Sequence, residues 1–132
     1  MSHVASEVSL LVAAMLIGLV QLFVAATAAR LQQGIPWGAG PRDEPRPIGG
    51  VAARLTRAFD NFMETFPFFA AAVLAAAWVG RLGGLTLWGS ILYVVARALY
   101  VPLYAAGVPY VRTAVWHVAI VGIFMVLAAI VT

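Results

Sequence analysis

The chain has 132 residues, of which 64% are hydrophobic and only 10% are charged. A globule of this length has too little interior to bury so much apolar surface, which excludes a water-soluble fold and indicates a polytopic membrane protein. The net charge of +3 comes from arginines scattered singly among apolar residues, which argues against a nucleic-acid partner. Because the chain has no cysteine, it can supply no disulfide, thiolate metal ligand or thiol nucleophile.

The first apolar run extends from Val8 to Ala29, and at about 1.5 Å per residue it gives roughly 33 Å of helix, enough to span a bilayer. A signal peptide is the competing interpretation. No Lys or Arg precedes the run, and it exceeds a usual signal-peptide core, so we expect the segment to be retained. The Gly- and Pro-rich segment 32–50 that follows is predicted to be a loop outside the membrane.

Three further apolar helices are predicted, separated by glycine-rich or proline-containing breaks at 80–84 and 107–109. The expected architecture is a single domain, 1–132, that forms an all-α four-helix membrane bundle, with helices at about 8–30, 51–80, 85–106 and 111–131. Four spans place both termini on one side. Most arginines lie around the first and third connections, so the positive-inside rule predicts that these loops are cytoplasmic and the termini outside.

Several polar residues fall inside the predicted spans, where a charge costs at least about 2.5 kcal/mol at the helix centre. At about 1.5 Å per residue, Asn61, Glu64 and Arg97 lie roughly 13, 18 and 13 Å below the cytoplasmic helix ends, within one leaflet. Offsets of three and four residues place them in two stripes, one on each helix: Arg54, Arg57, Asn61 and Glu64 on the second, and Arg97, Tyr100 and Tyr104 on the third. We expect the stripes to face one another, with Glu64 contacting Arg97 or Arg57.

Plainer roles compete for some of these residues. Asn61 alone could simply join two helices by a hydrogen bond, and Arg54 could extend its guanidinium to the headgroups instead of binding a ligand. Asp60 lies off the main stripe and is most simply a partner of Arg57. The interfacial aromatic belt is the preferred interpretation for Trp37, Tyr110 and Trp116.

No metal site is expected. His117 is near the start of the fourth predicted helix, whereas His3 lies across the membrane, and a metal needs several ligands at one place.

The stretch RAFDNFMETFPFF, residues 57–69, resembles the signature R-A-x-x-N-x-x-E-x-x-P-x-F of the MAPEG family, membrane proteins of eicosanoid and glutathione metabolism. Arg97, Tyr100 and Tyr104, followed by Arg112, are similar to the family's third-helix pattern and its further arginine. With the four-span layout, the resemblance covers nearly the whole chain, which looks like a small bacterial-type member. It therefore implies the bacterial inner membrane as the location.

The resemblance implies a homotrimer with glutathione as cosubstrate at each subunit interface, in a pocket on the cytoplasmic side. By position, Arg57, Asn61 and Glu64 would bind glutathione and Arg112 would stabilise its thiolate. The pocket would be completed by three other residues, Arg97, Tyr100 and Tyr104, and Arg30 corresponds to a further ligand in some members. The expected function is a transferase or peroxidase that acts on lipophilic electrophiles or hydroperoxides from the surrounding lipid.

The chemistry of these residue types fits those roles. Arginine can bind the carboxylates of glutathione bidentately, Glu64 can pair its ammonium, and Asn61 offers both a donor and an acceptor. The thiol must ionise before it attacks, and a nearby guanidinium favours the thiolate. No protein nucleophile is needed.

The chain also departs from the family pattern. Phe59 and Leu99 stand where some eicosanoid enzymes have polar or basic residues, and Arg112 is about one residue further from Tyr104 than in leukotriene-forming members. Such a slip turns a helical side chain by about 100°, enough to move Arg112 away from the sulfur. The alternative function is therefore a non-catalytic MAPEG-like subunit that binds lipid or packs in a larger membrane complex, and a channel or carrier is a distant third.

Overall fold

The computed structural model describes residues 5–132, so His3 lies outside the described part of the chain. Within it the regular elements are helices: α1 (Ser6–Gln33), α2 (Ile35–Ala39), α3 (Gly50–Trp78), α4 (Gly84–Ala105) and α5 (Tyr110–Val131). Four of them, all but α2, are long and apolar enough to cross a membrane. This confirms the predicted class, an all-helical chain with four helices that can span a membrane.

The segment between α1 and α3 has more structure than the loop that was predicted. Helix α1 continues to Gln33 and stops at Gly34, whose φ of 92° lies in the region that favours glycine. The short helix α2 follows, with Pro36 in its first turn. Trp37 Nε1 donates a hydrogen bond to the carbonyl oxygen of Glu44 at 2.7 Å, which folds the segment back on itself. A helix of five residues is too short to show an apolar period, so it could not be predicted from the sequence.

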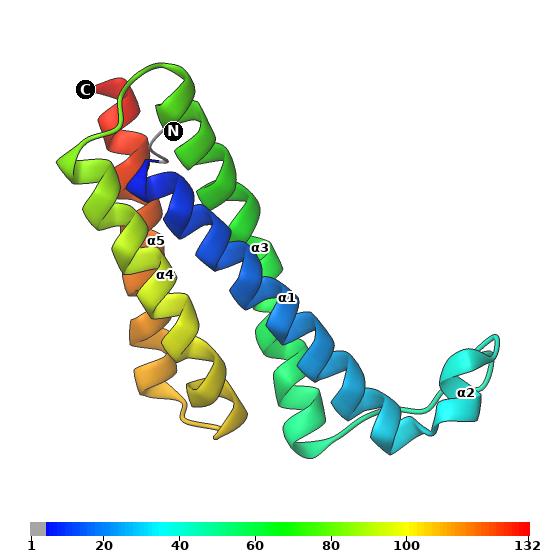
Figure 1. The fold of residues 1–132 in the computed structure, drawn as a ribbon. Coiled ribbons are helices and arrows are strands. Elements are labelled where there is room, and N and C mark those ends of the chain that lie inside the picture. Colours follow the sequence, from blue (N-terminus) through cyan, green and yellow to red (C-terminus); the bar gives the residue numbers. More distant parts are fainter. Residues whose placement is uncertain (1–4) are drawn as a thin grey trace.

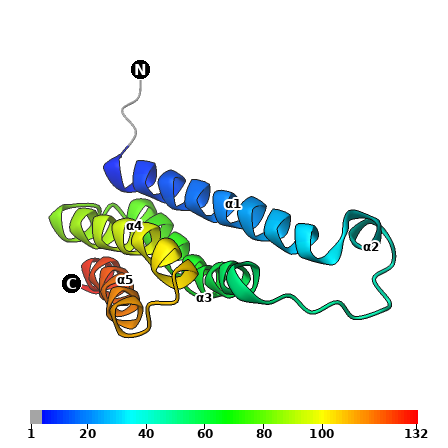
Figure 2. The same ribbon diagram turned by 90° about the horizontal axis from the view of Figure 1, so that it is seen from below.

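The four long helices are arranged with α3 and α4 between α1 on one side and α5 on the other (Figure 2). The start of α1, the α3–α4 turn and the end of α5 lie at one end of the bundle (Figure 1). Helix α2 and the α4–α5 turn lie towards the other end, where α1 diverges from α4 and α5 (Figure 1). The molecule therefore has a terminal half, which contains the start of α1 and the end of α5, and an α2 half.

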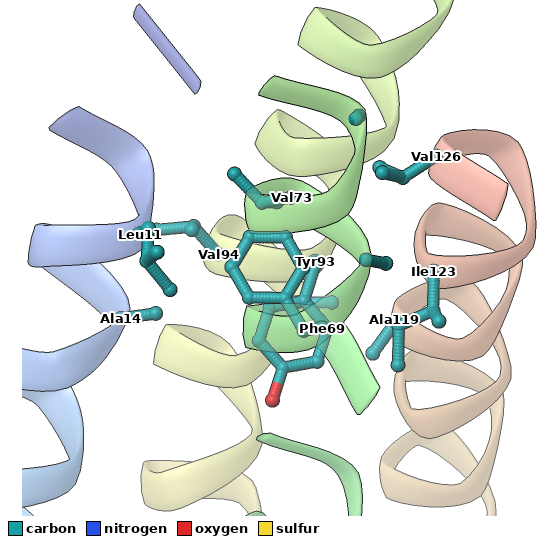
Figure 3. Close-up of a cluster of buried hydrophobic side chains, with 12 residues drawn as sticks. Leu11, Ala14, Phe69, Val73, Tyr93, Val94, Ala119, Ile123 and Val126 are labelled. Atoms are coloured by element: carbon teal, nitrogen blue, oxygen red, sulfur yellow. The ribbon is translucent and has the colours of Figure 1, made fainter. Parts of the chain in front are cut away.

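The terminal half contains the main apolar core (Figure 3). At its centre the rings of Phe69 on α3 and Tyr93 on α4 stack with centroids 4.1 Å apart. Side chains of α1 and α5 pack around this pair, and they include Leu11, Ala14, Ala119, Ile123 and Val126 (Figure 3). The Tyr93 hydroxyl lies 2.9 Å from the Thr65 hydroxyl, so its polar tip is satisfied. This core fixes α3, α4 and α5 relative to one another.

Helices α4 and α5 form the most extensive helix pair, and two glycines allow their backbones to approach. A Cβ atom added to Gly122 would lie 2.5 Å from the carbonyl oxygen of Gly89, and one added to Gly89 would lie 2.6 Å from that of Gly122. Small residues at a contact are a common way for membrane helices to pack closely. The glycine pair thus sets the position of α5, which carries Arg112.

Candidate functional site

A hollow of about 350 Å³, which we call the polar groove, lies in the α2 half of the bundle. It is formed by α3, the last turns of α4 and the first turn of α5. Its lining consists of Arg57, Asp60, Asn61, Glu64, Tyr100, Tyr104 and Arg112. Six of these seven residues were predicted from the sequence as site residues, and Asp60 is the addition.

Helical spacing accounts for most of this convergence. Residues three and four apart lie on one face of a helix, so Arg57, Asn61 and Glu64 reach the groove together from α3. Tyr100 and Tyr104, four residues apart near the end of α4, contact each other edge to face at 5.6 Å. Helix–helix packing brings these two faces together.

Arg112 enters the groove despite its shifted position in the sequence. It belongs to the first turn of α5, and its guanidinium carbon lies 4.3 Å from the centre of the Tyr104 ring. The slip of about one residue therefore does not turn this side chain away from Glu64 and the other groove residues.

Arg97 does not line the groove but lies behind it, with none of its surface exposed. Its Nη1 donates a hydrogen bond to Asn61 Oδ1 at 2.8 Å, and its guanidinium carbon lies 4.3 Å from the centre of the Tyr100 ring and 5.6 Å from that of Phe62. Two donors, Nε and Nη2, are buried without a hydrogen-bond partner among residues 5–132. Arg97 thus supports two groove residues from inside the bundle.

Arg30 is also separate from the polar groove. It lines another hollow of about 260 Å³, together with Thr56 and Phe59 of α3. Its guanidinium carbon lies 5.7 Å from the centre of the Trp37 ring. Thr56 and Phe59 flank Arg57 in sequence but lie on a different face of α3, so Arg30 and the polar groove are on different sides of this helix within one chain.

The expected ion pairs are not formed. Arg57 Nε donates to the Tyr104 hydroxyl at 3.2 Å, and Arg97 bonds Asn61. Within the described residues neither guanidinium pairs with Glu64 or Asp60, which corrects both predicted pairings. The reason is geometric: Arg97 is enclosed between aromatic rings inside the bundle, whereas the carboxylates of Asp60 and Glu64 lie on the exposed side of α3. The exposed guanidinium of Arg57 is instead directed towards Tyr104.

Arg54 has a role that the sequence did not indicate. Its Nε donates to the carbonyl oxygen of Ala105 at 2.9 Å, the last residue of α4. Helix C-terminal carbonyls lack partners within the helix and carry partial negative charge, so the contact is favourable. Arg54 thus links the start of α3 to the end of α4, next to the polar groove.

A second hollow of about 470 Å³, which we call the apolar groove, lies between α3 and α5. It is lined by Glu64, Thr65, Phe68, Trp116, Ile120, Ile123, Phe124 and Leu127. Glu64 belongs to the walls of both grooves, so the two adjoin at this residue. The apolar groove was not predicted from the sequence, although the spacing of its α5 residues by three and four places them on one helix face.

Nothing in residues 5–132 brings together three or more metal-ligating side chains. His117 Nδ1 lies 2.8 Å from the carbonyl oxygen of Thr113, one turn earlier in α5, and its ring contacts Trp116 edge to face. Both contacts of His117 are therefore made within α5.

The sequence model of the MAPEG family matches residues 9–132. No curated protein and no solved structure shows a significant match to the chain. The family match covers all four membrane-spanning helices almost completely, together with each residue of the polar groove. The chain therefore belongs to the MAPEG family of integral membrane proteins, which includes both glutathione-dependent enzymes and non-catalytic members.

Proposed function

We propose that the protein is a glutathione-dependent membrane enzyme, of transferase or peroxidase type, that acts on lipophilic electrophiles. The observation that carries the proposal is a pair of adjoining grooves. One is lined by guanidinium, carboxylate, carboxamide and phenol groups, and the other by aromatic and aliphatic side chains. A charged thiol peptide and an apolar acceptor need two such compartments in contact.

The polar groove offers groups that complement glutathione. Arg57 can bind a carboxylate, and Glu64 can pair the ammonium. Asn61 Oδ1 already accepts a hydrogen bond from Arg97, which leaves the amide nitrogen of Asn61 as the donor for a ligand. The volume of about 350 Å³ falls within the range of small-molecule sites.

Arg112 is our candidate for thiolate stabilisation. A guanidinium close to sulfur lowers the pKa of a bound thiol, because it favours the charged form. In the transferase reaction the thiolate attacks an electrophilic carbon, so the sulfur–carbon bond forms while the bond to the leaving group breaks and the leaving group takes the electron pair. In the peroxidase reaction two glutathione molecules would be oxidised to their disulfide, and the two electrons and two protons they release would reduce a hydroperoxide to an alcohol and water. Either way the chain itself supplies no nucleophile.

The apolar groove would hold the second substrate. Phe68 and Trp116 are among its walls, and Glu64 marks its junction with the polar groove. A lipophilic acceptor could enter it from the surrounding lipid and meet the sulfur where the grooves adjoin. Such positioning alone can supply a large part of a rate enhancement.

Homotrimer assembly and membrane orientation are parts of the same proposal. Arg30 faces away from the polar groove of its own chain, so a neighbouring subunit would have to supply this residue if it serves as a ligand. The α2 half, which carries most of the arginines, would face the cytoplasm of a bacterial cell, with the termini outside.

Calorimetry in detergent tests the proposal. The native protein should bind glutathione, and Arg57→Ala and Glu64→Ala should each weaken binding by about tenfold or more, because hydrogen bonds to charged groups contribute about 1.5 to 3 kcal/mol. Arg81→Ala is the matched control, since Arg81 is exposed in the α3–α4 turn at the other end of the bundle. No heat with the native protein, or unchanged affinity in both groove variants, would rule out the proposed site. Binding without turnover of any electrophile would place the chain among the non-catalytic members.

A further inference from the structure

Asp60 is the charged groove residue to which the proposed function gives no role. It is exposed on α3 and lines the polar groove together with Glu64, four residues later. Residues four apart on a helix are neighbours, so the two carboxylates lie side by side on one wall. Neither carboxylate has a hydrogen bond or ion pair within residues 5–132, although two guanidinium groups line the same hollow.

The guanidinium groups are gathered elsewhere in the groove. Arg57 donates to the Tyr104 hydroxyl, and its guanidinium carbon lies 5.8 Å from the centre of the Tyr104 ring. Arg112 lies 4.3 Å from the centre of the same ring. The polar groove thus has an acidic wall, formed by Asp60 and Glu64, and a basic region around Tyr104. This separation of charge matches a ligand that has a cationic group and an anionic group at different places.

Repulsion between the carboxylates of Asp60 and Glu64 also favours a cationic ligand group at this wall. Like charges four residues apart on a helix repel each other and destabilise it. At membrane depth a charge costs more still, unless it has a partner. Because neither carboxylate pairs with a protein cation within residues 5–132, a ligand cation placed between them would relieve both effects.

We propose that Asp60 is a further ligand residue, and that Asp60 and Glu64 together bind the ammonium group of a γ-glutamyl thiol peptide. The anionic groups of the ligand then face Arg57 and Arg112. This inference rests on the proposed function and adds to it a second carboxylate contact, one that recognises the ammonium and not the thiol.

The test compares two ligands, glutathione and N-acetylglutathione, which lacks the ammonium. Calorimetry with Asp60→Asn should show glutathione affinity reduced by about tenfold, the loss expected for one charge-assisted contact. The affinity for N-acetylglutathione should stay unchanged, and Glu64→Gln should show the same selectivity. Asp60→Glu, which keeps the charge, should restore most of the glutathione affinity. Asp43→Asn is the matched control, because Asp43 is an exposed acid in the α2 segment, away from the groove.

The outcomes separate this inference from the proposed function. If the native protein binds glutathione and Asp60→Asn binds it equally well or more tightly, Asp60 is not a ligand and only this inference fails. Equal losses for both ligands would also overturn it, since they would show that Asp60 does not act on the ammonium. If the native protein binds no glutathione, the proposed function fails and this inference falls with it.

Discussion

The two halves of the bundle use polar groups differently. In the terminal half the Tyr93 hydroxyl meets Thr65, and the buried Glu7 accepts a hydrogen bond from Thr86 at 2.7 Å. In the α2 half the guanidinium of Arg97 keeps two unpartnered donors, and Asp60 and Glu64 have no partner within the described residues. In the terminal half these polar groups pair across helix contacts, although the uncharged Ser90 hydroxyl is buried without a partner within residues 5–132, whereas in the α2 half charged groups are left open. Such local departures from good packing are typical of functional sites.

The strongest test of this division alters the terminal half alone. Gly122→Ala should separate α4 from α5, because its Cβ would lie 2.5 Å from a backbone oxygen, which cannot give way as a flexible side chain can. We expect the free energy of unfolding to fall by about 1 to 3 kcal/mol. Thermal unfolding in detergent measures it, and the displacement of α5 should also weaken glutathione binding.

Gly84→Ala is the control for that variant, since a Cβ there would meet nothing within 4 Å. Equal stability of the Gly122→Ala and Gly84→Ala proteins would show that the glycine contact does not set the α4–α5 packing.

The next largest effect should come from the α2 half. Arg112→Met removes the guanidinium near the proposed sulfur position, and we expect the turnover rate to fall by about a hundredfold, a loss typical of removing one charge-stabilising group. Glutathione affinity should also fall, because Arg112 faces the anionic groups of the ligand, whereas the unfolding temperature should change little. Steady-state kinetics, together with the ultraviolet absorbance of the bound thiolate, provide the measurement. A variant that keeps the thiolate absorbance of the native protein would remove Arg112 from this role.

A smaller effect is expected from the residue behind the groove. Arg97→Met keeps the apolar length of the side chain but removes the donor to Asn61, so Asn61 can turn its oxygen towards the ligand. We expect glutathione affinity to fall by about tenfold. The unfolding temperature should stay unchanged or rise, because a buried charge with unsatisfied donors is costly. A lower unfolding temperature would instead make Arg97 part of the structural framework and weaken the division between the halves.

The smallest effect is expected for Tyr104→Phe. The variant loses the hydrogen bond from Arg57 Nε, which is 3.2 Å long, but keeps the ring that contacts Arg112. The hydroxyl acts on the ligand only by holding Arg57 in place, so glutathione affinity should fall only a few-fold. Titration calorimetry of Tyr104→Phe beside Tyr104→Leu separates the two contributions of this residue. Equal losses in both variants would assign the effect to the hydroxyl alone.

Much of the site could be inferred from helical spacing. Arg57, Asn61 and Glu64 share a face of α3 wherever that helix packs, because the period of 3.6 residues is local. The same holds for Tyr100 and Tyr104 on α4. The sequence could not show that Arg97, on the same stripe, would be enclosed between Phe62 and Tyr100, since burial depends on which side chains fill the space between helices.

The sequence by itself determined that this is a membrane protein with four apolar helices and a polar stripe in one half, because composition and helical period require no knowledge of the partners. Only the tertiary structure decided that Arg112 enters the polar groove, that Arg30 lies on another side of α3, and that Asp60 lines the groove without a partner among residues 5–132. The physical reason is that these outcomes depend on the distance and rotation between helices. Contacts such as that of Gly89 with Gly122 set both quantities, and they join residues far apart in the chain.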